Sequence, residues 1–224
     1  MNRGLAAMGD RNFRWFFLAR AITMITGSMS SIALAFAVLE IDNDPVSLSL
    51  VLTAFTVANV VFVLFGGVVA DRLPRALVIQ ACYVLDLLSI GAIAYLLFTR
   101  TATIPVMVAL AAVNGASTAF VLPAMQGIIP QLTRPETLQQ ANAMLSFVRS
   151  AVTIGGPVIA GILVTTAGPA WAMVVQLIGW LSAIPILAMV RLPPPVGDGR
   201  FSLFADLRIG WTEFWSRSWL VAVV

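Results

Sequence analysis

Two charged residues lie deep inside stretches of sequence that are otherwise apolar. Asp86 comes ten residues after Ala76, and Arg149 comes ten residues after Gln139. At about 1.5 Å per helical residue, each lies roughly 15 Å along its helix. An ionisable side chain at that depth in a membrane is usually paired or faces a polar cavity. Asp86 and Arg149 are therefore candidates for a cavity or a coupling path; their equal depth also allows an ion pair, and a local polar contact would suffice for Asp86.

Uncharged polar residues form a second group of candidates. One face of the first apolar run carries small residues at helical spacing: Thr23, Thr26, Gly27, Ser30 and Ser31. This stripe either forms a wall of a substrate pathway or lets neighbouring helices approach closely. The fourth apolar run has no arginine, and its polar residues are Asn114, Ser117 and Gln126. The candidate cavity residues from both runs are Thr23, Thr26, Ser30, Asn114 and Gln126.

The residue inventory excludes several kinds of site. The sequence has no histidine, one cysteine (Cys82) and no lysine, so its 13 basic residues are all arginines. Histidine-ligated metal sites, imidazole catalysis, cysteine metal clusters and internal disulfides are therefore excluded. The net charge of +3 gives little support to nucleic-acid binding, which would show as a strongly basic patch on one face. We expect no catalytic residues, no metal, no cofactor and no enzyme activity.

The composition shows which elements must position the candidate residues. Of the 224 residues 60% are hydrophobic and 10% are charged, and the mean hydropathy is +0.97. A soluble domain has about 45–50% apolar and about 25% charged residues. A membrane-spanning helix needs about 20 apolar residues. Six runs reach that length, at 14–39, 47–70, 76–98, 103–128, 141–166 and 170–190, and predict an all-α, polytopic membrane protein.

The arginines predict how these spans are oriented. Eleven of the 13 fall on one side of the six-span layout, Arg100 alone falls on the other, and Arg149 lies within a span. Cytoplasmic loops carry the excess of basic residues. We therefore expect a multi-pass protein of the cell (inner or plasma) membrane with a cytoplasmic N-terminus.

The expected domain organisation has four parts. Residues 1–13 form a cytoplasmic N-terminus and residues 14–190 form the six-helix transmembrane bundle. Three prolines end the sixth span, and a tryptophan-rich stripe then predicts an amphipathic helix at the membrane surface within a cytoplasmic linker, 191–218. The alternative for this stripe is a segment that simply re-enters the membrane. Residues 219–224 form the truncated start of a seventh helix.

The turn between the second and third runs carries the most informative motif, Gly67-Val68-Val69-Ala70-Asp71-Arg72-Leu73-Pro74-Arg75. It resembles the G-x-x-x-D-R-x-G-R signature of the major facilitator superfamily, at the same place in the chain. Gly67, Asp71, Arg72 and Arg75 match, whereas Pro74 replaces a glycine. Gly67 would let a neighbouring helix approach closely. The resemblance implies that Asp71 belongs to a latch against a C-terminal half and holds an outward-open state.

The fifth run carries a second resemblance. Gly156, Pro157 and Gly161 are similar to the end of the helix-five motif of proton-coupled drug exporters, with Ala160 in place of one glycine. A glycine-lined helix with a proline can pack closely and hinge. The wider pattern resembles the enterobactin-exporter-like and secretion-effector subgroup of the same family. That resemblance covers the whole chain but only the N-terminal half of the family's twelve-helix fold.

The resemblance implies the function that we expect. The chain would be the N-terminal half of a transporter that exports a small molecule by alternating access, coupled to protons. Its partners would be the lipid bilayer, a small-molecule substrate, protons, and the missing C-terminal half or a second copy, with no nucleic acid. The alternative is a non-transporting six-helix membrane partner or assembly protein, or an inactive truncated fragment.

Overall fold

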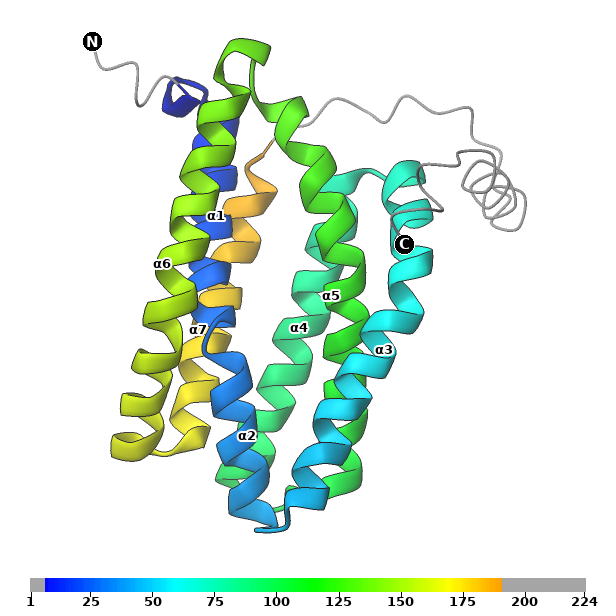
Figure 1. The fold of residues 1–224 in the computed structure, drawn as a ribbon, viewed down its shortest axis with the longest axis vertical. Helices are drawn as coiled ribbons and strands as arrows, with labels where there is room; N and C mark the ends of the chain where they lie inside the picture. Colours follow the sequence, from blue (N-terminus) through cyan, green and yellow to red (C-terminus); the bar gives the residue numbers. More distant parts are fainter. Residues whose placement is uncertain (1–6, 191–224) are drawn as a thin grey trace, which may run out of the picture.

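The computed structural model describes residues 7–190, apart from the side chains of residues 67, 68 and 70–72. Within this part the chain forms seven helices and no strands (Figure 1): α1 Arg11–Gly27, α2 Ser30–Ile41, α3 Pro45–Arg72, α4 Arg75–Phe98, α5 Ile104–Leu132, α6 Pro135–Ala167 and α7 Pro169–Ala188. Because α1 and α2 follow each other in one span, these helices give six spans long and apolar enough to cross a membrane. This confirms the predicted all-α, six-span fold. The predicted surface helix and seventh-helix start lie outside the described residues.

Side-chain caps define where two of the helices begin. Asp10 precedes α1, and its Oδ1 accepts a hydrogen bond from the Asn12 backbone N–H at 2.8 Å. Asp44 precedes α3, and its Oδ1 accepts from the Val46 backbone N–H at 2.9 Å. Such caps satisfy N–H groups that have no partner within the first helical turn. Gly168 separates α6 from α7 with a φ of 91°, a conformation that favours glycine.

The runs 103–128 and 141–166 leave a predicted connection between them that is too long. Residues 131–140 are largely helical, because α5 continues to Leu132 and α6 already begins at Pro135. Proline suits the first position of a helix, where its missing N–H costs no hydrogen bond. Glu136 in the first turn is also favourable, since a negative charge there complements the helix dipole. Polar residues at this end therefore lengthen the helices beyond the apolar runs.

The first span is interrupted, whereas the sequence predicts one helix over 14–39. The interruption lies at Ser28 and Met29, between α1 and α2. The Ser28 hydroxyl donates to the Ile25 carbonyl at 2.7 Å, and the Met29 N–H bonds to the Thr26 carbonyl, three residues back instead of four. A Gly-Ser pair is a common site for such kinks, because serine offers its own hydrogen bonds to the backbone.

The helices form one bundle with a paired pattern of contacts (Figure 1). α4 packs against α7, α1 packs on α7, and α5 packs on α4. α3 runs along α5, and α6 lies against α7 and the α1–α2 span. The contact between the third and fourth spans (α4 and α5) therefore corresponds to the contact between the sixth and first spans (α7 and α1). This pattern is consistent with two three-helix repeats, which we expect for a bundle of this kind.

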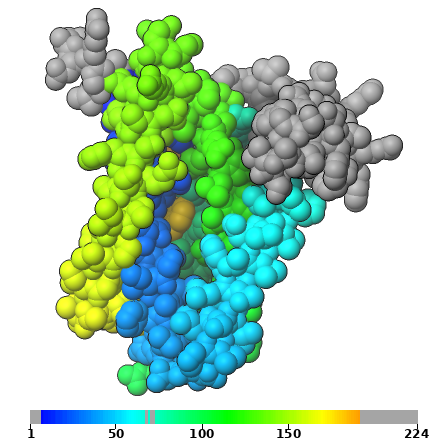
Figure 2. Space-filling view, viewed as in Figure 1, coloured from blue at the N-terminus to red at the C-terminus, as the bar shows by residue number. Residues whose placement is uncertain are grey.

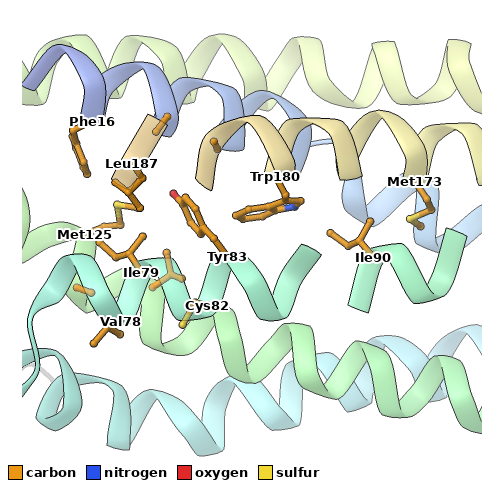
Figure 3. Close-up of a cluster of buried hydrophobic side chains, with 14 of the residues drawn as sticks. Phe16, Val78, Ile79, Cys82, Tyr83, Ile90, Met125, Met173, Trp180 and Leu187 are labelled. Atoms are coloured by element: carbon orange, nitrogen blue, oxygen red, sulfur yellow. The ribbon is translucent and has the colours of Figure 1, made fainter. Parts of the chain in front are cut away.

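The apolar core lies between α1, α4, α5 and α7 (Figure 3). At its centre Tyr83 of α4 meets Trp180 of α7 edge to face, with ring centroids 4.6 Å apart. Phe16 and Ile79 are fully buried beside them. Outside the core, large apolar side chains such as Leu64 of α3 are exposed, as a lipid-facing surface requires.

α3 and α5 approach each other closely at two glycines. A Cβ atom at Gly115 of α5 would overlap the Phe55 backbone of α3, and one at Gly66 of α3 would overlap the Ala119 backbone of α5. Small residues allow this separation, and membrane helices associate mainly through such close packing. The approach brings Asn59 Nδ2 within 3.1 Å of the Gly115 carbonyl, to which it donates a hydrogen bond.

This contact predicts the effect of a single methyl group. Gly115→Ala should separate α3 from α5 and stretch the Asn59 hydrogen bond, lowering the free energy of unfolding by about 1–3 kcal/mol. Thermal unfolding of the purified protein in detergent measures the loss. Gly155→Ala on α6 is the matched control, because its new methyl group meets nothing within 4 Å. Equal stability of the two variants would contradict the importance of the α3–α5 contact.

Candidate functional site

A cavity of about 300 Å³ lies in the face of the bundle between the α1–α2 span and α5. α4 and α7 contribute its inner wall, and in the space-filling view α7 is visible at the bottom of a hollow (Figure 2). The polar or charged residues that line it come from four spans: Arg20, Thr23, Ser30, Ser31, Asp86, Asn114, Thr118 and Gln176. Its apolar lining includes Phe55, Ile90 and Trp180. The cavity is thus apolar with a few polar groups, as small-molecule sites usually are.

Three buried polar atoms in this lining have no hydrogen-bond partner among the described residues. They are Asp86 Oδ1, Gln176 Oε1 and Trp180 Nε1. Buried polar atoms are nearly always paired, so unpaired atoms need an explanation such as water or a ligand. Here two acceptors and one donor belong to a single cavity lining, a set that a polar ligand or ordered water can satisfy together.

Asp86 is buried, with 3% of its surface exposed. Its carboxyl group interacts with Ser117, whose hydroxyl also donates to the Cys82 carbonyl at 3.1 Å. Asp86 also interacts electrostatically with Tyr83, whose hydroxyl shares a hydrogen bond of 3.2 Å with Thr23 and interacts with Arg20. Asp86 therefore belongs to a polar group that joins α1, α4 and α5.

Four of the predicted cavity residues line this cavity: Thr23, Ser30, Asp86 and Asn114. Asn114 also donates to Ser89 Oγ at 3.1 Å, which fixes its amide against α4. Thr26 is instead buried against α7, where a Cβ atom at Gly179 would overlap it. For Thr26 the close-packing alternative therefore describes its place better than the pathway alternative.

Sequence reasoning missed Gln176, Trp180 and Arg20 as cavity residues. Gln176 is buried with 1% of its surface exposed, and its amide donates to the Thr26 carbonyl at 3.2 Å. A signal was present, because Gln176 is the first polar side chain after the α6–α7 turn and Trp180 follows four residues later on the same helical face. The orientation argument counts Arg20 among the eleven arginines on the cytoplasmic side, whereas the structure places it in the lining of the cavity.

Gln126 and Arg149 lie in a second pocket of about 250 Å³, between α1, α5 and α6. Arg20, Asn142 and Ser146 complete its polar lining. In the described part of the chain no ion pair joins Arg149 to Asp86, and the two residues line different pockets. The ion pair considered from their equal depth is therefore not formed. Arg20 instead lines both pockets and stands between them.

The motif at the α3–α4 turn is described only in part. The surroundings of Gly67 and the side chains of Asp71 and Arg72 lie outside the described set, although the backbone of all three is helical. The neighbouring Gly66 makes a close approach to α5, and the approach expected of Gly67 stays a prediction. Arg75 begins α4, and its guanidinium lies over α5 at Gly127, where a Cβ atom would overlap it. Because Gly127 has no side chain, the Arg75 guanidinium can pack directly on the backbone of α5.

The glycine–proline motif of the fifth span, which is α6, lies beside the interruption of the first span. A Cβ atom at Gly156 of α6 would overlap Ser28, so this glycine accommodates the kink between α1 and α2. Pro157 lies inside α6, and a Cβ atom at Gly161 would meet nothing within 4 Å. Of the motif residues, Gly156 has a clear packing role within the described bundle.

A metal site is not found in the described part of the chain, where no three His, Cys, Asp or Glu side chains gather. Cys82 is a free, buried thiol.

Comparison with known proteins identifies the family. Residues 16–224 match the family model described as Major Facilitator Superfamily. The enterobactin exporters EntS of Shigella boydii serotype 18 and Escherichia coli O1:K1 are 28% identical to this chain over 191 residues, and that of Citrobacter koseri is 27% identical. Each match covers 82% of this chain but 44% of the relative, so the chain spans about half the length of these proteins. The predicted resemblance to this subgroup is confirmed, and the chain belongs to the major facilitator superfamily.

Proposed function

We propose that this chain is the N-terminal half of a proton-coupled exporter of a small molecule. Transport would proceed by alternating access, with this bundle rocking against a second six-helix half around a site near the middle of the membrane. The observation that carries the proposal is the buried Asp86 carboxyl group, which lines the cavity with one oxygen unpaired among the described residues. The second half, or a second copy of this bundle, would close the open side of the cavity.

The distribution of charge supports the orientation that we propose. The chain enters α1 at the same end of the bundle at which α3 is followed by α4 and α5 by α6. Most arginines of the described helices belong to the segments at this end: Arg11, Arg14, Arg20, Arg72, Arg75 and Arg134. Basic residues mark the cytoplasmic side. We therefore place the N-terminus in the cytoplasm and the protein in the inner membrane, so that cargo enters the cavity from the arginine-rich end.

Asp86 is the group best placed to carry the proton. The titratable or charged groups around it are Arg20 of α1 and, on its own helix, Cys82 and Tyr83. The described lining of the cavity holds no second acid with which Asp86 could share a proton. A buried carboxyl group without a full set of partners can be satisfied by a proton, a cation or a donor on a ligand. Exchange between proton and cargo at this carboxyl group would couple their movements.

The motif at the α3–α4 turn would control which side of the membrane the cavity faces. By the family resemblance, Asp71 contacts the second half when the cavity is open to the outside. Arg75 is seated over Gly127, so its guanidinium is held at the same end of the bundle. The space at Gly127 would keep the Arg75 guanidinium close enough to contact the second half. If Arg75 is displaced from this space, the α3–α4 turn should no longer control the rocking of the two halves.

Replacement of Asp86 tests the proposed coupling. The intact gene product is reconstituted into vesicles that are acidic inside, and uptake of radiolabelled enterobactin, the cargo named for its relatives, is followed. Asp86→Asn should lower gradient-driven uptake to the level of empty vesicles but leave exchange of internal for external cargo, because the amide binds cargo but carries no proton. Glu40→Gln, an exposed residue at the end of α2, is the control and should transport normally. Gradient-driven uptake by Asp86→Asn would refute this role, and no transport by the parent protein would favour the non-transporting alternative.

A second prediction concerns the seat of Arg75. Gly127→Ala should displace the Arg75 guanidinium, which is the far end of a flexible side chain, so the free energy of unfolding should change by no more than about 1 kcal/mol. Transport should nevertheless fall to the level of Arg75→Gln, and the double variant should be no worse than either single one. Vesicle transport and thermal unfolding measure the two effects. Normal transport by Gly127→Ala would show that this seat has no role.

A further inference from the structure

We propose that the pocket between α1, α5 and α6 binds the anionic group of an amphiphilic organic anion. This inference rests on the proposed function, because it names the class of cargo that the exporter would take. The pocket has a volume of about 250 Å³ and lies next to the central cavity. It is a separate subsite, because its lining shares only Arg20 and Leu122 with that cavity.

The charge of the pocket favours an anion. Arg20 and Arg149 both line it, and no acidic residue is among its described lining residues. Its remaining polar groups, Gln126, Asn142 and Ser146, are neutral and can donate hydrogen bonds. Two guanidinium groups that line one pocket, with no acid among its described residues, give it a positive potential that an anion would neutralise. Arginine also binds carboxylates and similar planar anions through paired hydrogen bonds.

The rest of the pocket favours an apolar body on the same molecule. The lining contains six apolar side chains: Phe16, Met24, Leu122, Met125, Ile129 and Leu145. An inorganic ion would leave this surface unused, whereas an aromatic or branched acid would cover it. Methionine side chains adapt to ligands of different shape, so the pocket suits a class of acids more than a single one.

Arg20 gives the two pockets a common boundary. It lines both, and it also interacts with the Tyr83 hydroxyl, which lies beside Asp86 in the core. A larger cargo can therefore place its anionic end between Arg20 and Arg149. Its polar end would then reach the unpaired atoms of Gln176 and Trp180 in the central cavity. Because Asp86 also lines the central cavity, the same cargo would contact both the anion subsite and the proposed proton carrier.

Equilibrium binding of matched probes to the purified intact protein in lipid nanodiscs tests this inference. The probes are radiolabelled naphthoate and its neutral isostere naphthamide. Naphthoate should bind about tenfold more tightly than naphthamide, because a charge-assisted contact with arginine is worth about that factor. Arg149→Gln should remove this preference, and Arg149→Lys should keep most of it. Arg134→Gln, at an exposed arginine outside the pocket, is the control and should bind both probes like the parent protein.

The outcomes separate this inference from the proposed function. Equal binding of naphthoate and naphthamide, or equal effects of Arg149→Gln and Arg134→Gln, would overturn the anion subsite even if vesicles show proton-coupled export. Selective naphthoate binding that depends on Arg149 would support the subsite even if export fails. A preserved preference in Arg149→Gln together with loss of binding in Arg20→Gln would also overturn the proposed pairing of the two arginines.

Discussion

The hydrocarbon core of a membrane offers no water to polar groups, and this one constraint organises the whole bundle. Backbone groups must be paired within each span, so the chain forms long helices that begin at side-chain caps such as Asp10 and Asp44. Polar side chains must also find partners, which explains why Asn59 donates to the Gly115 carbonyl where α3 and α5 approach each other. Among the described residues, one atom each of Asp86, Gln176 and Trp180 lacks a partner, and all three atoms belong to one cavity lining. The exceptions to the constraint therefore mark the site.

Close packing at glycines links that constraint to the shape of the bundle. Gly66 and Gly115 bring α3 against α5, Gly179 receives Thr26, and Gly156 accommodates Ser28 at the interruption of the first span. Each of these contacts removes a side chain where two helices meet, and together they leave the α1–α2 span and α5 apart on the face that holds the cavity. The glycines thus mark the places where helices pack closely, and the cavity lies where the α1–α2 span and α5 do not.

Much of the fold could be predicted from sequence, because each span is a long apolar run and the motif turn has a fixed place among them. The interruption at Ser28 could not, since it depends on a local hydroxyl–carbonyl bond and on space provided by Gly156 of a distant helix. Asp86, Thr23, Ser30 and Asn114 were predicted for the cavity, whereas Thr26 packs against α7. The position of Asp86 and of Arg149 along its helix can be counted from the sequence, but the direction in which each side chain leaves its helix cannot. That direction places the two residues in different pockets with Arg20 between them.

The central claim is that cargo binds in the cavity marked by the unpaired polar atoms. Thiol labelling tests it most directly, with Ser30→Cys in the cavity wall compared with Ser49→Cys on the exposed surface of α3. The buried thiol of Cys82 in the parent protein gives the background rate. Saturating cargo should slow modification of the cysteine at position 30 and leave position 49 unchanged. Equal rates with and without cargo at position 30, in a protein that binds that cargo, would contradict the account.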